Sequence, residues 1–116
     1  PQNLEAEMSV LGSMLMEEEA IAQAVELLEE KSFFLEAHRK IFSAILDLYD
    51  KGRAVDLITL TEQLRKQGNL EEVEGAAYLT SLINSVPTAA NVEYYARIVQ
   101  EKAVLRSLIN TATQIV

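Results

Sequence analysis

The sequence NLEAEMSVLGSMLM at residues 3–16 carries the periodicity of an amphipathic helix. Asn3 is a residue type that caps helix N-termini, because its side chain accepts a hydrogen bond from a free backbone N–H group. Apolar side chains then recur at helical spacing, at Leu4, Met8, Leu11 and Leu15. Glu5 and Glu7 fall in the first turn, where acidic side chains interact favourably with the helix dipole. We therefore predict a helix from Leu4 to Met16.

The same periodicity predicts helices along the rest of the chain. Glu17, Glu18 and Glu19 open a second helix, with a core stripe expected at Ile21, Val25 and Leu28. Four more helices are expected over residues 36–51, 59–67, 75–84 and 91–116. The helix at 36–51 is apolar around more than one face, so we expect it to be the central helix. The chain is therefore predicted to be all-α.

Several connections have a predicted role. Phe33 and Phe34, before the third helix, are expected to fill the core. Asp56 and Thr59 are competing N-caps for the fourth helix, and Asn91 is the expected N-cap of the last one. The only strand-like stretch, residues 55–60, is too short and too isolated to form a sheet.

Composition restricts the possible classes of protein. With 116 residues, about half of them apolar and 24% charged, the chain has the size and make-up of one globular domain. It has no cysteine, which excludes disulfides and thiolate metal sites. No run of roughly 20 apolar residues exists that would span a membrane, and no secretory signal is visible.

The charge is acidic and unevenly distributed. The net charge is −8, so the surface on average repels the phosphates of nucleic acids. Residues 1–30 contain no basic residue and eight acidic ones: Glu5, Glu7, Glu17, Glu18, Glu19, Glu26, Glu29 and Glu30. Such a distribution favours a protein partner with a basic face over a nucleic acid, although solubility is the better explanation of any single charge.

The sequence contains no recognisable reaction chemistry. Its four glycines form neither a GxxxxGK[ST] nor a GxGxxG motif, so no nucleotide site is expected in this segment. His38 is the only histidine and is interpreted as a packing or capping residue. Consecutive glutamates on a helix diverge by about 100° and do not converge on a metal ion. We therefore predict no catalytic, cofactor or metal site, and an acidic helical interaction domain.

The last helix has an apolar surface wider than one small domain requires. A seam with alternating spacing of four and three, broken only by Glu101, runs through Tyr94, Ile98, Leu105, Leu108, Ala112 and Ile115. It is widened by Val104, Ile109 and Val116. The part from Tyr94 to Val99 is expected to fold back onto the domain. The part from Leu105 to Val116 is expected to bury against a missing antiparallel hairpin helix, a second copy, or both. Because this helix continues to Val116 without a stop signal, we expect a fragment of a longer chain.

Five blocks of the sequence resemble the N-terminal domain of the bacterial replicative DNA helicase of the DnaB type. They occur in that family's order and cover nearly the whole chain: PQNLEAEMSVLGSML, HRKIFSAILDLYDKG, VDLITLTEQL, GNLEEVEGAAYLTSL and VPTAANVEYYARIVQEKAVLRSLI. One departure is Glu74-Gly75, where many members have two glycines.

The resemblance implies a non-catalytic collar domain of a cytoplasmic, ring-shaped hexameric helicase at the replication fork. It implies a helical globule over residues 1–90, of about five to six helices, followed at 91–116 by the first helix of a dimerising hairpin. Paired hairpins would build a trimer of dimers, with interface candidates Leu105, Leu108, Ala112 and Val116. ATP and Mg would belong to a separate motor domain.

The resemblance also implies docking of the C-terminal domain of a DnaG-type primase. The positions matching the family's primase-contact or primase-modulating sites are Glu5 or Glu7, Tyr78, Ile109 and Ile115. A rival hypothesis is direct guidance of single-stranded DNA by the collar, for which Arg97, Lys102 and Arg106 offer a basic stripe.

Overall fold

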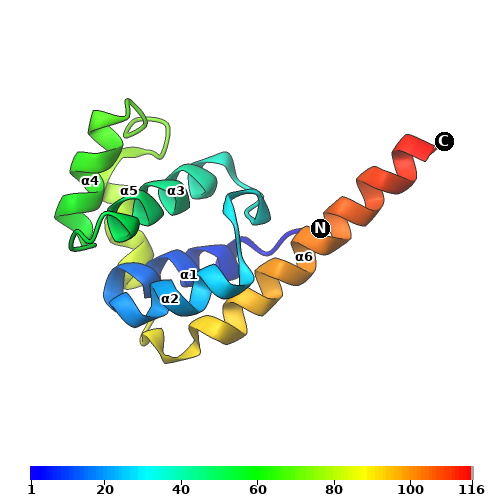
Figure 1. The fold of residues 1–116 in the computed structure, drawn as a ribbon, viewed down its shortest axis with the longest axis horizontal. Coiled ribbons are helices and arrows are strands. Elements are labelled where there is room, and N and C mark those ends of the chain that lie inside the picture. The colour runs from blue at the N-terminus through cyan, green and yellow to red at the C-terminus, as the bar shows by residue number, and fades with distance from the viewer. Residues whose placement is uncertain (116) are drawn as a thin grey trace.

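The computed structural model describes residues 1–115. Within that range every regular element is helical, as predicted (Figure 1). The α-helices are α1 (Leu4–Met16), α2 (Glu18–Leu27), α3 (Glu36–Asp50), α4 (Leu57–Lys66), α5 (Gly75–Asn84) and α6 (Val92–Ile115). Two short 3₁₀ helices precede α3 and α6 respectively: η1 (Glu30–Ser32) and η2 (Ala89–Asn91). No helix in the described part of the chain is long and apolar enough to cross a membrane.

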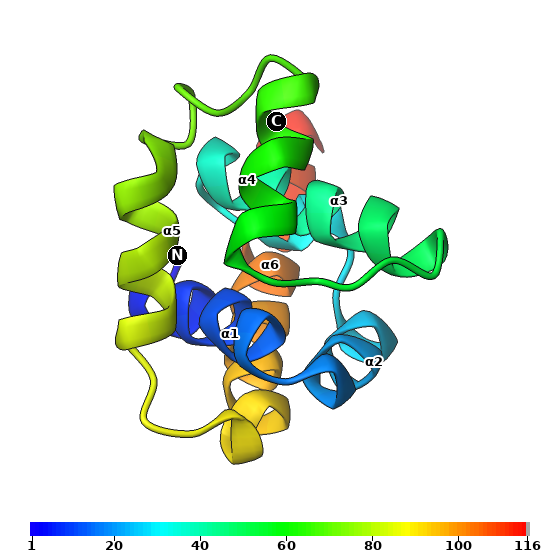
Figure 2. The same cartoon turned by 90° about the vertical axis from the view of Figure 1, so that its left-hand side faces the viewer.

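The centre of the fold is α1, not the third helix as the sequence suggested. Helix α1 packs against α2, α3, α5 and α6, whereas α3 lies beside α4, η1 and α1 (Figures 1 and 2). The small residues of α1 allow this central position, because they let neighbouring helices approach closely. At Gly12, a Cβ atom would lie 2.2 Å from the backbone oxygen of Leu82 on α5.

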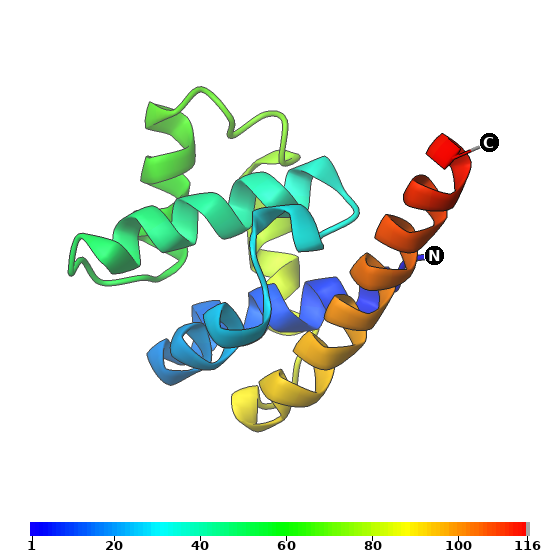
Figure 3. The ribbon, with the colours of Figure 1, turned by 45° about the vertical axis from the view of Figure 1, so that its right-hand side comes forward.

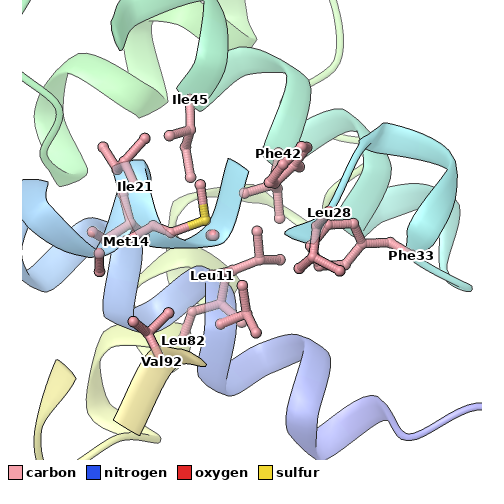
Figure 4. Packing of buried hydrophobic residues seen from close by; sticks show 14 of the residues in the cluster. Leu11, Met14, Ile21, Leu28, Phe33, Phe42, Ile45, Leu82 and Val92 are labelled. Atoms are coloured by element: carbon pink, nitrogen blue, oxygen red, sulfur yellow. The ribbon is translucent and has the colours of Figure 1, made fainter. Parts of the chain in front are cut away.

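Side chains from several helices and from the connection before α3 meet in the core. Figure 4 shows Leu11 and Met14 of α1 among side chains from five other parts of the chain: Ile21, Leu28, Phe33, Phe42, Ile45, Leu82 and Val92. Each of these side chains is almost fully buried. A single contiguous core therefore organises the globule.

The local caps largely follow the sequence. The side chain of Asn3 accepts a hydrogen bond from the backbone N–H of Ala6, and α1 has its predicted bounds. Asp56 and Thr59 do not compete, since they form a reciprocal capping box at the start of α4. Asn91 ends η2, where the capping side chain is Thr88, and α6 begins at the next residue.

Three predicted core positions are wrong. Val25, Phe34 and Tyr94 are exposed by 38%, 39% and 68%. Ala24 takes the buried place in α2, and Phe33 alone fills the core from the connection before α3. In α6 the packed face is Val92, Ala96 and Val99, which share one side of the helix and leave Tyr94 on the other.

The two halves of α6 have different surroundings. Its first half packs on α1 and α2, as expected for residues 94–99 taken together, and its second half projects beyond the globule (Figures 1 and 3). From Ser107 to Ile115 every residue is exposed. Val116 lies outside the described residues, so the interface prediction for it has no structural counterpart.

Candidate functional site

A buried polar network joins three helices of the globule. The carboxylate of Glu7 (α1) lies 2.8 Å from Nδ1 of His38 (α3), and Nε2 of His38 lies 2.6 Å from the hydroxyl of Tyr78 (α5). Glu7 and His38 are 1% and 0% exposed, while Tyr78 is partly buried. The second oxygen of Glu7 accepts the backbone N–H of Phe34 at 2.8 Å. Every member therefore has a hydrogen-bond partner, as buried polar groups require.

The chemistry of Glu7 assigns the protons in this network. An ionised carboxylate can only accept, so Nδ1 of His38 carries a hydrogen and donates it to Glu7. In a neutral imidazole Nε2 then accepts, and the Tyr78 hydroxyl donates to it. Burial of the ring raises the pKa of Tyr78, and the charges of Glu74 and Glu7 raise it further. Tyr78 is thus held in the neutral form that can donate this bond.

A second region is the exposed half of α6. Five aliphatic side chains lie on it with exposures between 39% and 81%: Val104, Leu105, Leu108, Ile109 and Ile115. Ala112 is also exposed. A groove of about 910 Å³ runs between this half of α6 and the segment from α2 to η1. Val104, Ala103 and Leu28 line it together with charged side chains such as Glu26 and Arg39.

Arg106 fixes the point where α6 leaves the globule. Its guanidinium donates to the backbone oxygens of Ser32 at 2.8 Å and Pro1 at 2.9 Å. The same group lies over the ring of Phe34, 5.6 Å from its centroid, a geometry typical of cation–π contacts. Phe34 is therefore exposed beside an arginine and lies outside the core.

The sequence of this chain is similar to one known protein family. The family model for the DnaB-like helicase N-terminal domain matches residues 1–101. The chain belongs to this family. The resemblance inferred from the sequence blocks is thereby confirmed.

Relatives and solved structures agree with the assignment. The replicative DNA helicases DnaC of Bacillus subtilis and DnaB of Geobacillus stearothermophilus are each 52% identical to the chain over 115 residues. These matches cover 99% of the chain and 25% of each relative, so the chain spans about a quarter of their length. The crystal structure of the N-terminal domain of DnaB helicase from Mycobacterium tuberculosis superposes with a TM-score of 0.97 at 48% identity, covering 99% of this chain and 83% of that one.

The predicted primase-contact residues lie in three places. Glu7 and Tyr78 are brought together through His38, at the interface of α1, α3 and α5. Ile109 and Ile115 lie on the projecting half of α6, 52% and 81% exposed. Glu5 is exposed on the first turn of α1. Because Glu7 is buried, it cannot contact a partner directly in this conformation, and a role for it would act through its network.

The hypothesis of direct DNA guidance relies on three basic side chains of α6, and two of them have partners within the chain. Arg97 pairs with Glu93 at 2.8 Å, and Arg106 is bonded to backbone oxygens and stacked on Phe34. Only Lys102 of the three is without such a bond in residues 1–115. In the same range no group of three or more potential ligands is placed to hold a metal ion.

Sequence reasoning missed the pairing of His38 with Glu7. His38 was interpreted as a packing or capping residue; it is buried, caps no helix end and bonds on both sides. A signal was present, because Glu7 shares a helix face with Leu11 and Met14, and His38 shares one with Ile41 and Phe42. These positions indicate that both polar groups are buried and need partners, although they do not specify that the two groups bond to each other.

Proposed function

We propose that this domain is a non-catalytic assembly and primase-docking module of a replicative helicase. Assembly would use the exposed half of α6, and docking would use the α5 side of the globule together with α6. The observation that carries the proposal is the aliphatic row on α6, since side chains such as Leu108, Ile109 and Ile115 are exposed on a helix whose first half packs on the globule.

Membership in the family supports the assembly role. In a longer helicase we expect this domain to form part of a collar in a homohexameric ring built from dimers, working in the cytoplasm at the replication fork. The interface would include Leu105, Leu108 and Ala112, which lie on the projecting part of α6. ATP and Mg would be bound elsewhere in such a protein, and single-stranded DNA would pass through its ring.

A solved relative supports the docking role. The structure described as a DnaB-like replicative helicase and its interactions with primase matches with a TM-score of 0.84 at 33% identity, over 97% of this chain and 27% of that one. The partner we propose for this domain is the C-terminal domain of a DnaG-type primase. Glu5, Tyr78, Ile109 and Ile115 are the candidate contacts, and Glu7 would act through its bond to His38.

The test is a calorimetric titration of this domain with the C-terminal domain of its cognate primase. We expect saturable binding that Ile109→Asp and Ile115→Asp each weaken by about tenfold, because each buries a charge against an apolar partner. Asn110→Asp adds the same charge between these positions and is the matched control. Circular dichroism should show unchanged helicity in all three variants, since all three residues are exposed.

Sedimentation of the same variants separates assembly from docking. Loss of self-association with retained primase binding would assign the two isoleucines to the copy-to-copy interface. If the domain releases no heat with primase and both proteins are folded, the docking part of the proposal is wrong. The DNA-guiding rival predicts instead a salt-dependent affinity for oligo-dT, measured by fluorescence anisotropy.

A further inference from the structure

Helix α4 and the end of α3 carry a cluster of basic side chains on an otherwise acidic protein. Lys51 and Arg53 follow α3, and Arg65 and Lys66 lie in the last turn of α4. These are four of the ten basic residues of the chain. The cluster lies at the opposite end of the molecule from the projecting half of α6 (Figure 1).

The charges of this cluster are mostly unneutralised. Elsewhere, Lys31, Lys40 and Arg97 form ion pairs with glutamates, and Arg39 and Arg106 donate to backbone oxygens. In the cluster Arg65 pairs with Glu62 on the same helix. Lys51, Arg53 and Lys66 form no ion pair with any residue of the described chain. Asp47, Asp50 and Asp56 lie in the same part of the chain, so the available positive charge is that of the groove lining, where Arg53 and Lys66 are unpaired among the described residues.

The same corner contains an apolar groove. It has a volume of about 420 Å³ and is lined by residues of α4, by Leu48 of α3 and by Arg53. Ile58 lies in it with 76% of its surface exposed, more than any other large aliphatic side chain outside α6. Ile58, Glu62 and Lys66 are spaced by four residues and so share one face of α4. In Figure 2 this helix lies in front of the others.

We propose that this groove binds an acidic amphipathic segment of a protein partner. Aliphatic side chains of the segment would cover Ile58 and Leu48, and its carboxylates would lie against Arg53 and Lys66. This surface is separate from the primase and assembly surfaces proposed above, so it adds a third binding face to the domain.

Charge complementarity favours an acidic peptide over nucleic acid. No aromatic side chain is among the described residues lining the groove, so bases would have nothing to stack on. A nucleic acid strand would also extend a row of phosphates over a protein of net charge −8. Of the charged side chains that line the groove, Arg53, Arg65 and Lys66 are basic and Glu62 is acidic, so a short acidic segment meets mainly basic groups there.

The probe is a synthetic amphipathic helix with leucine along one face and glutamate on both flanks. We expect it to shift the amide NMR resonances of residues 48–66 in this protein, and added salt should weaken the binding. A scrambled peptide of the same composition should bind more weakly, because its leucines no longer share a face. Shifts confined to other residues would overturn the proposal.

Two sets of variants test the charged and apolar parts separately. Arg53→Glu with Lys66→Glu should weaken peptide binding by about tenfold, whereas Lys31→Glu with Lys102→Glu changes the net charge equally and should change it by less than about twofold. Ile58→Ser removes apolar contact without altering charge and should also weaken binding. All these side chains except Lys102 are largely exposed, so the fold should be retained, which circular dichroism checks.

Three results would overturn the proposed occupant. Equal weakening by both double variants would mean unspecific charge attraction. Binding of oligo-dT at residues 48–66, with no binding of the peptide, would assign the corner to nucleic acid. A change in sedimentation of the protein alone on Arg53→Glu with Lys66→Glu would assign it to a second copy of this chain.

Discussion

At the scale of single residues, the most consequential group is the carboxylate of Glu7. A buried charge is tolerated only when its hydrogen-bonding capacity is satisfied, because removing it from water is costly. Glu7 achieves this with the backbone N–H of Phe34 and the imidazole of His38, each at 2.8 Å. It thereby links α1 to the start of α3 through hydrogen bonds, which an aliphatic side chain could not form.

Loss of this carboxylate should destabilise the fold strongly. Glu7→Ala leaves the buried donors of His38 and Phe34 without a partner, and we expect the free energy of unfolding to fall by about 3 kcal/mol. Glu7→Gln keeps the shape and one acceptor and should lose less. Glu5→Ala, at an exposed position of the same turn, is the control. Urea denaturation measures all three, and equal effects at positions 5 and 7 would contradict the network.

Tyr78 should make the stability depend on alkaline pH. Burial, with Glu74 and Glu7 nearby, raises its pKa above the ordinary value of 10.0. The unfolded state therefore ionises first, so the stability from neutral Tyr78 is complete below about pH 10 and is lost as pH rises through the folded-state pKa. Tyr78→Phe should remove this alkaline loss of stability, which urea denaturation at about pH 10 and above measures. Tyr94→Phe, at an exposed position, should not.

Only part of this site could be predicted from sequence. The first-turn position of Glu7 predicted only an acid near the helix dipole, whereas the structure buries its side chain. His38 is 31 residues from Glu7 and 40 from Tyr78, so no local pattern specifies these pairs. Their contact depends on how α3 and α5 pack across α1, which only tertiary structure provides.

At the scale of elements, local signals predicted the bounds of α1 and α5 correctly but not those of α4, which begins at Leu57 and not at residue 59. Asn3 and Gly75 lie at the starts of α1 and α5, both of which have their predicted bounds. Core positions were less predictable in α2 and α6, because residues next to the predicted core positions are also apolar. In α2, which packs on α1, Ala24 is buried and Val25 is exposed, so the more hydrophobic of the two side chains is not the buried one.

The contact between α1 and α5 should not tolerate a methyl group. In an open helix Gly→Ala stabilises by up to about 1 kcal/mol. At Gly12 the new Cβ would lie 2.2 Å from the oxygen of Leu82, so the helices must separate. We expect Gly12→Ala to lower the free energy of unfolding by about 2 kcal/mol, measured in urea. Ser9→Ala in the same helix should be nearly neutral, and a stabilised Gly12→Ala protein would show that the helices are not in close contact.

At the scale of the whole molecule, charge and shape separate different functions. Residues 1–30 hold eight acids and no base, so the remaining ten acids and ten bases cancel. The sequence alone showed this imbalance and the helical class. It did not show that Lys51, Arg53 and Lys66 remain without an ion pair near α4 in the described chain, because that depends on which arginines and lysines find partners elsewhere in the fold.

The projecting half of α6 should be dispensable for folding. Ending the chain after Ser107 keeps Arg106 on Ser32, and every described residue that it removes is exposed, so the free energy of unfolding should change by less than about 1 kcal/mol. Ending it after Glu101 also removes Arg106 and should cost about 2 kcal/mol more, because Arg106 makes hydrogen bonds and a cation–π contact there. Urea denaturation compares the two chains, and sedimentation should show that both lose self-association. Strong destabilisation by the shorter deletion would mean that residues after Ser107 contribute to the fold itself, and the aliphatic row on α6 would then no longer support an assembly surface.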